Sequence, residues 1–162
     1  MPFLLILLLI SSQSIFAEDS RAFSPDYGGD VSFMYGEIQQ VADWEEVCSP
    51  EFPFTKERNL RAVKEWRKQY SRFVTEIEER FSELIWHEAK QDSGRRKAML
   101  DYFEAKHADA KKQFKQVLLN GGMNTFRKQC ENYPLYLKSS QMNLEISRGE
   151  IVNKIRISRP RE

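Results

Sequence analysis

The middle of the chain, residues 56–90, contains neither glycine nor proline, and this uninterrupted run constrains the fold more than any other feature. Thr55 stands before it as a good helix N-cap. Apolar side chains recur in the run at steps of three and four, at Val63, Trp66, Tyr70, Phe73, Ile77, Phe81 and Leu84. This period predicts an amphipathic α-helix. Because such a helix would be about 52 Å long, we expect a bend or a break within it.

A second helix is predicted over residues 95–119, where apolar side chains again follow a helical period. A short turn precedes it, in which Asp92 or Ser93 is available as the N-cap. Gly121 and Gly122 end the pattern in the manner of a left-handed C-cap. Because the connection is short, the two helices should form a long antiparallel hairpin.

Two short helices are expected on either side of this hairpin. Residues 37–48 show an amphipathic period, and Pro50 stops the helix just after it. The other short helix should run from Asn124 to Cys130, and Pro134 should end it. The fold class predicted from these elements is all-α.

The C-terminal part of the chain allows two interpretations. Met142, Leu144 and Ile146 alternate with polar residues, as in a small β-hairpin. The alternative is an extended strip followed by a short helix over residues 150–157. We favour the second, because an isolated two-stranded hairpin is weak. The segment is therefore expected to be irregular or partly extended, with a frayed tail at residues 158–162.

The N-terminus has the pattern of a secretory signal peptide over residues 1–17. An apolar run from Phe3 to Ile10 is followed by small and polar residues, and cleavage is expected after Ala17. No Lys or Arg precedes the run. A retained membrane anchor is the less favoured alternative, because spanning a bilayer takes about 20 apolar residues. We therefore expect a periplasmic or secreted protein without stable membrane insertion once the signal is removed.

The mature chain is expected to begin with a flexible arm at residues 18–36. Proline and glycine punctuate this stretch, and we find no sustained period in it. Residues 37–157 are then expected to form a single helical domain, which suits the length of the chain.

Cys48 and Cys130 are the only two cysteines of the sequence. In an oxidising compartment an even count favours a disulfide, and a bridge between them would close a loop of just over eighty residues. Constraining such a loop stabilises a fold by about 4.5 kcal/mol. The alternative is a pair of unrelated buried thiols. Neither cysteine stands in a CxxC motif or next to a histidine, so a structural bridge is favoured over a catalytic thiol.

Charge is segregated along the chain, although the net charge is only +1. Residues 18–51 hold nine acidic side chains and one basic side chain, whereas residues 95–162 hold fifteen basic and seven acidic ones. The two segments could neutralise each other within the fold. The other interpretation is a basic surface that is free for an anionic partner.

The strongest candidate for such a surface is the start of the long helix, which is locally basic. A solvated helix face is the ordinary interpretation of a charge run, and a binding face for an anion is the other. An exposed tryptophan on the same long helix would strengthen the second interpretation. The candidate residues are Arg58, Arg61, Lys64, Arg67, Lys68 and Trp86.

No catalytic, metal or cofactor signature stands out. The only histidines are His87 and His107, and the hairpin register separates them by about 13 Å along the helix axis. Glu104 and His107 form a single Glu-x-x-His element, whereas a di-iron bundle needs two. Neither a G-x-S-x-G elbow nor a phosphate-binding loop occurs. We therefore expect no catalytic residue, no metal and no cofactor.

The function expected from these observations is non-enzymatic binding. The partner would be another exported protein or an anionic envelope component, and export disfavours nucleic acid. The alternative is an envelope chaperone or inhibitor that grips another exported protein between its helices. An enzyme of unknown class comes third.

Overall fold

The computed structural model describes residues 25–158. Within this range the chain is helical and forms no strand, which confirms the all-α prediction. None of these helices is long and apolar enough to cross a membrane. The predicted signal peptide lies outside the described residues. The elements, with η for a 3-10 helix, are α1 (Pro25–Glu51), η1 (Pro53–Thr55), α2 (Lys56–Gln69), α3 (Ser71–Glu88), α4 (Ser93–Asn120), α5 (Met123–Leu137), η2 (Ser140–Met142), α6 (Leu144–Ser147) and α7 (Gly149–Ile157).

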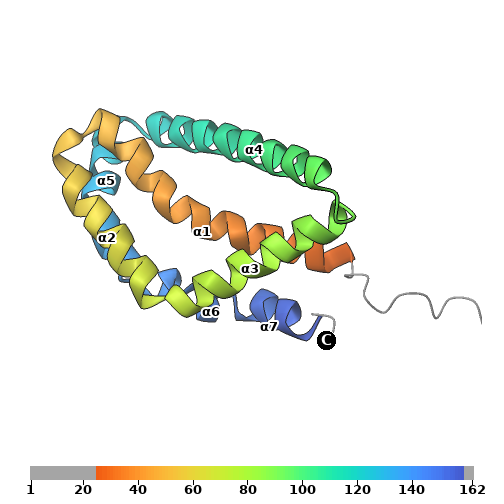
Figure 1. Cartoon of the computed structure of the whole chain (residues 1–162). Coiled ribbons are helices and arrows are strands. Elements are labelled where there is room, and N and C mark those ends of the chain that lie inside the picture. Colours follow the sequence, from red (N-terminus) through yellow and green to blue (C-terminus); the bar gives the residue numbers. More distant parts are fainter. Residues whose placement is uncertain (1–24, 159–162) are drawn as a thin grey trace, which may run out of the picture.

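The break expected in the long helical run is confirmed at Tyr70. Its backbone (φ −104°, ψ 21°) leaves the helical region, and α2 and α3 meet there at an angle (Figure 1). At the break, the Tyr70 N–H donates to the Trp66 carbonyl at 3.0 Å, and the Tyr70 carbonyl accepts from the Val74 N–H at 2.9 Å. The run therefore forms two helices that wrap around a core.

The short turn between α3 and α4 also matches the prediction. Lys90 and Gln91 adopt left-handed backbone angles (φ 52° and 59°), and the Asp92 carboxylate accepts a hydrogen bond from the Arg95 backbone N–H at 2.7 Å. The two helices diverge from this turn, and α1 packs against both of them (Figure 1). The hairpin is thus open, and α1 fills the space between its arms.

The prediction of a flexible arm over residues 18–36 is wrong for residues 25–36, since α1 begins at Pro25. Helix α1 is therefore much longer than the short helix expected over residues 37–48. The cause is a row of fully buried side chains at steps of four and three, at Tyr27, Val31, Met34, Ile38 and Val41. Burial of this row outweighs the poor helix propensity of the glycines beside it.

The C-terminal part is helical rather than extended. A helix at residues 150–157 is confirmed as α7, but helical turns (η2 and α6) replace the expected extended strip. Pro134 does not end its helix, because α5 continues to Leu137. The final residues 159–162 lie outside the described part.

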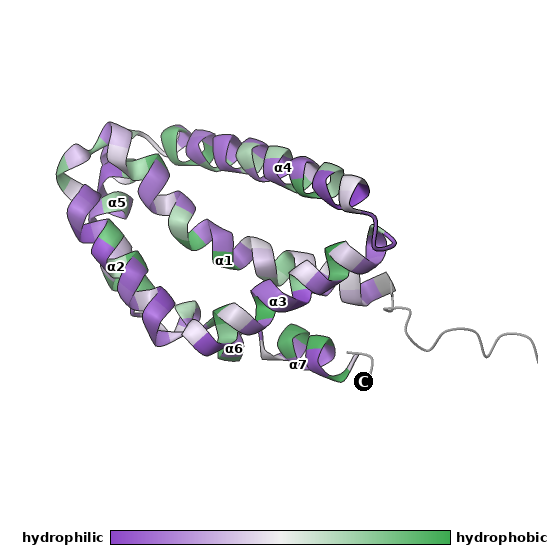
Figure 2. Cartoon of the chain, in the orientation of Figure 1, coloured by the Kyte–Doolittle hydropathy of each residue, from purple (hydrophilic) through white to green (hydrophobic). Residues whose placement is uncertain are grey.

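One main core joins α1, α2, α3, α5 and α7, and a smaller one surrounds the disulfide. Helix α4 contributes one buried residue, Leu118, to the smaller core, and its partly buried hydrophobic residues Met99, Phe103, Phe114 and Leu119 pack against the two cores. Helices α2 and α4 are coloured mostly as hydrophilic, with short hydrophobic stretches between (Figure 2). Both helices therefore expose many polar and charged side chains.

Candidate functional site

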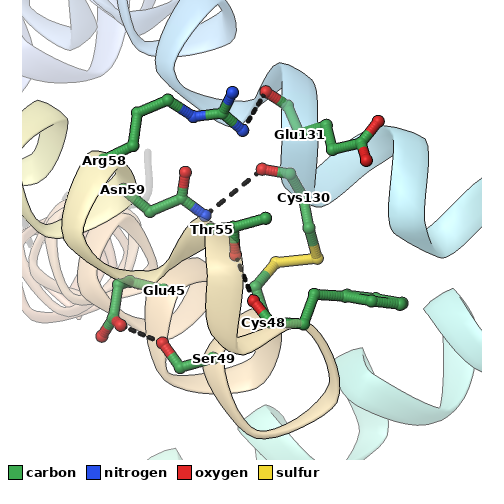
Figure 3. Close-up of a disulfide and its surroundings, with 9 residues drawn as sticks. Glu45, Cys48, Ser49, Thr55, Arg58, Asn59, Cys130 and Glu131 are labelled. Atoms are coloured by element: carbon green, nitrogen blue, oxygen red, sulfur yellow. Dashed lines mark hydrogen bonds between the residues drawn. A yellow bond between two sulfur atoms is a disulfide. The ribbon is translucent and has the colours of Figure 1, made fainter.

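The predicted disulfide between Cys48 and Cys130 is present, with a Cα–Cα distance of 5.6 Å (Figure 3). Both cysteines are fully buried. They join the end of α1 to the middle of α5, inside the smaller core formed with Val47, Phe52, Leu118 and Phe126. The bridge is thus a structural clamp at one end of the molecule.

Two side chains of α2 bind the backbone of α5 next to this clamp (Figure 3). Pro134 has no N–H, so the Cys130 carbonyl loses its donor within the helix. The buried Asn59 side-chain amide donates to that carbonyl at 3.2 Å. Arg58 donates to the neighbouring Glu131 carbonyl at 2.7 Å. This pairing explains how the helix tolerates a proline in its interior.

The candidate basic residues of α2 separate into two groups. Arg58 is engaged with α5, and Arg67 forms an ion pair with Glu78 at 2.9 Å. Arg61, Lys64 and Lys68 are exposed and form no ion pair with any described residue. Their spacing of three and four places them on one face of α2, opposite the buried residues of that helix. We call these three residues the basic face.

Trp86 does not join the basic face. It is 40% exposed, as a binding role would require, but it lies near the far end of α3. Fifteen residues of helix separate it from the start of α3, which corresponds to about 22 Å. Its ring is covered in part by the Arg96 guanidinium, 5.7 Å from the ring centroid. Trp86 is therefore a separate feature of the surface.

The acidic segment and the basic segment pair with each other along α1 and α4. Glu46 accepts from Lys111, and Glu51 accepts from Lys115 at 2.6 Å. Asp43 contacts the His107 ring at 2.9 Å. The partners follow the same order along both helices, so α1 and α4 run parallel. The interpretation of internal neutralisation is confirmed for these helices.

The Asp43–His107 pair was missed by sequence reasoning, which considered His107 only as a possible metal ligand. Asp43 is only 6% exposed, and this burial raises the pKa of its carboxyl, although the nearby His107 opposes the rise. A hydrogen bond to Glu46 raises the pKa of the Lys111 ammonium. The opposite charges of the two segments indicated in the sequence that they attract each other. They did not indicate which residues form the pairs.

A trough between α1 and α4 adjoins this row of pairs. One hollow of about 510 Å³ is lined by apolar side chains that include Tyr35, Phe81 and Phe103. A second hollow of about 300 Å³ shares Gly36 and His107 with it. A Cβ at Gly36 would meet nothing within 4 Å, so this small residue helps to keep the trough open.

No three metal-ligating side chains gather into a possible metal site in the described part of the chain. His107 is held by a carboxylate, while His87 is exposed on α3. The features described so far that are available for recognition are the basic face and the trough.

Comparison with protein-family models, with curated proteins and with solved structures gives no match. The contacts, burial and charges described above therefore carry the functional proposal.

Proposed function

We propose that this chain is an exported, non-enzymatic binding protein that holds an acidic partner protein on the basic face of α2. One observation carries the proposal. Lys111 and Lys115 of α4 are paired with carboxylates of α1, whereas Arg61, Lys64 and Lys68 form a row of exposed cations without an ion pair among the described residues. A charge row that the fold does not neutralise is available to a partner of opposite charge.

The surroundings of the basic face favour a protein partner over a simple counter-ion. Leu60 lies on the same helix and is 46% exposed, so an apolar contact is available beside the charges. Complementary charges speed association and set its specificity, while apolar burial adds affinity. Association should therefore weaken as the ionic strength rises, because salt screens exposed charges.

The binding test compares two triple variants with the same change in net charge. Arg61→Gln/Lys64→Gln/Lys68→Gln removes the basic face, and Lys90→Gln/Arg95→Gln/Lys138→Gln removes three exposed cations elsewhere that form no ion pair among the described residues. With poly-L-glutamate as the acidic probe at low salt, the first variant should bind about tenfold more weakly, since each exposed pair contributes roughly 0.5 kcal/mol. Affinity can be measured by thermophoresis, and the control variant should lose much less.

Three outcomes would contradict the proposal. An equal loss in both variants would show an effect of net charge alone. Binding only to vesicles that contain phosphatidylglycerol would assign the face to an anionic lipid surface. Unchanged binding in the first variant would direct attention to the trough between α1 and α4, where the alternative function, a chaperone or inhibitor, would place its partner.

Export is the second part of the proposal. The leader at residues 1–17 supports it, and so does the pairing of both cysteines, because disulfides persist outside the reducing cytosol. The mature protein isolated from the producing cell should begin at Glu18 and contain no free thiol. Intact mass spectrometry with and without an alkylating reagent measures both. A mature chain that keeps residues 1–17, or alkylation without prior reduction, would contradict this part.

A further inference from the structure

A hollow of about 440 Å³ lies where α5 meets α1, away from the basic face. Helix α1 contributes Trp44. Helix α5 contributes residues at steps of three and four that follow one side of the helix, among them Gln129, Asn132 and Tyr136. The volume of the hollow falls within the range of small-molecule sites in proteins.

Trp44 is held in one orientation at this hollow. Its ring stacks on Tyr133, with centroids 5.2 Å apart and planes 13° apart, and Phe114 contacts it edge-on at 4.8 Å. The Tyr133 hydroxyl in turn donates to the Val41 carbonyl, which fixes the ring beneath. Tyr136 lies 6.4 Å from Trp44 and is 42% exposed. The result is a preformed aromatic wall that remains partly open to solvent.

Polar side chains that form no side-chain hydrogen bond with another described residue lie beside the aromatic wall. Thr125, Gln129 and Asn132 are exposed and line the hollow, and none forms a side-chain hydrogen bond with another described residue. Amide side chains both donate and accept hydrogen bonds, and a hydroxyl does the same. Lys128 adds one positive charge, and no carboxylate lines the hollow.

We propose that this hollow binds a carbohydrate, with a pyranose ring against Trp44 and Tyr136. The C–H face of a sugar ring is apolar and packs on aromatic rings, whose faces carry partial negative charge. The sugar hydroxyls need donors and acceptors together, which Gln129, Asn132 and Thr125 supply. A cationic ligand would also suit aromatic rings, but Lys128 and the lack of a carboxylate oppose it.

The test uses affinity electrophoresis of the purified, disulfide-bonded protein in gels that contain one polysaccharide each. The neutral probes are dextran, laminarin and hydroxyethyl cellulose, and the acidic probes are alginate and polygalacturonate. At least one gel should retard the wild-type protein, and Tyr136→Ala and Asn132→Ala should each weaken the retardation about tenfold. Lys128→Ala should weaken binding to an acidic probe and leave binding to a neutral probe unchanged, which distinguishes the two classes of sugar.

Matched variants keep this test specific. Tyr102→Ala removes a tyrosine of α4 that is 59% exposed, and Gln113→Ala removes an exposed amide of the same helix. Both should be retarded like the wild type. Because Tyr136 and Asn132 are exposed, their variants should keep the wild-type melting temperature, which shows that they fold. Absence of retardation by all five polysaccharides, or equal retardation of the Tyr136 and Asn132 variants and the wild type, would overturn the proposal.

Discussion

Removing the disulfide is expected to lower the free energy of unfolding by about 4.5 kcal/mol, through the double variant Cys48→Ala/Cys130→Ala. The bridge spans a sequence separation of 82, so its loss frees a long loop in the unfolded chain. For a protein of this size, the loss corresponds to a fall in melting temperature of about 10–18 °C. Thermal unfolding followed by far-ultraviolet circular dichroism measures it.

The loss of stability without the disulfide should be uneven across the molecule. Helix α5 depends on the bridge and on the hydrogen bonds from Asn59 and Arg58 to its backbone, whereas α3 packs on α1 through the main core. Amide hydrogen exchange should therefore rise first in α5, while α3 stays helical. A reducing agent should produce the same change in the wild type and no further change in the double variant. An unchanged melting temperature in the double variant would exclude the structural role of the bridge.

The sequence predicted those features that depend on local pattern. The helical period over residues 56–90, an N-cap at Asp92 or Ser93 and the pairing of two lone cysteines all follow from neighbouring residues or from simple counting. A bend or break was expected because the helix would be about 52 Å long, but its position at Tyr70 was not predicted. The Tyr70 ring packs 5.3 Å from Trp66, whose indole N–H donates to the Met142 carbonyl. The hydrogen bond between Trp66 and Met142 comes from tertiary structure and leaves no trace in the local period.

The helix α1 was underestimated because local signals disagreed there. Gly28, Gly29 and Gly36 each oppose a helix by about 1 kcal/mol, and they led to the prediction of an arm. Burial of an apolar side chain contributes roughly 1.5–3 kcal/mol, and five such side chains recur between Tyr27 and Val41. The period was present in the sequence, and its summed burial exceeds the cost of the glycines.

The contacts between helices could not be predicted in detail. Opposite charge of the two segments predicts attraction, but the register of α1 against α4 decides that Asp43 meets His107. Likewise, the donor that compensates Pro134 is Asn59, and the two are far apart in sequence. The aromatic wall at Trp44 depends on the same packing. The geometry of such sites can be derived only from the three-dimensional fold, because the residues that form them are far apart in the sequence.

The second large effect is expected from Met34→Ala, which should lower the free energy of unfolding by about 2–5 kcal/mol. Met34 is fully buried in the main core, at the centre of the buried row of α1. Its neighbour Phe33 is 45% exposed and provides the matched control. Phe33→Ala should cost less than about 1 kcal/mol, mainly through the Arg148 guanidinium that lies 5.9 Å from its ring. Chemical denaturation of both variants measures the difference.

Comparing Met34→Ala with Phe33→Ala tests whether residues 25–36 form a packed helix or a flexible arm. Alanine has a higher helix propensity than methionine, so a loss of stability in Met34→Ala must come from the core and not from the helix itself. In a helix, successive side chains lie about 100° apart, which makes neighbouring positions unequal. In a flexible arm both side chains would be solvated, and neither substitution would change the unfolding midpoint. Equal, small effects of the two substitutions would therefore show that residues 25–36 do not pack as α1 does.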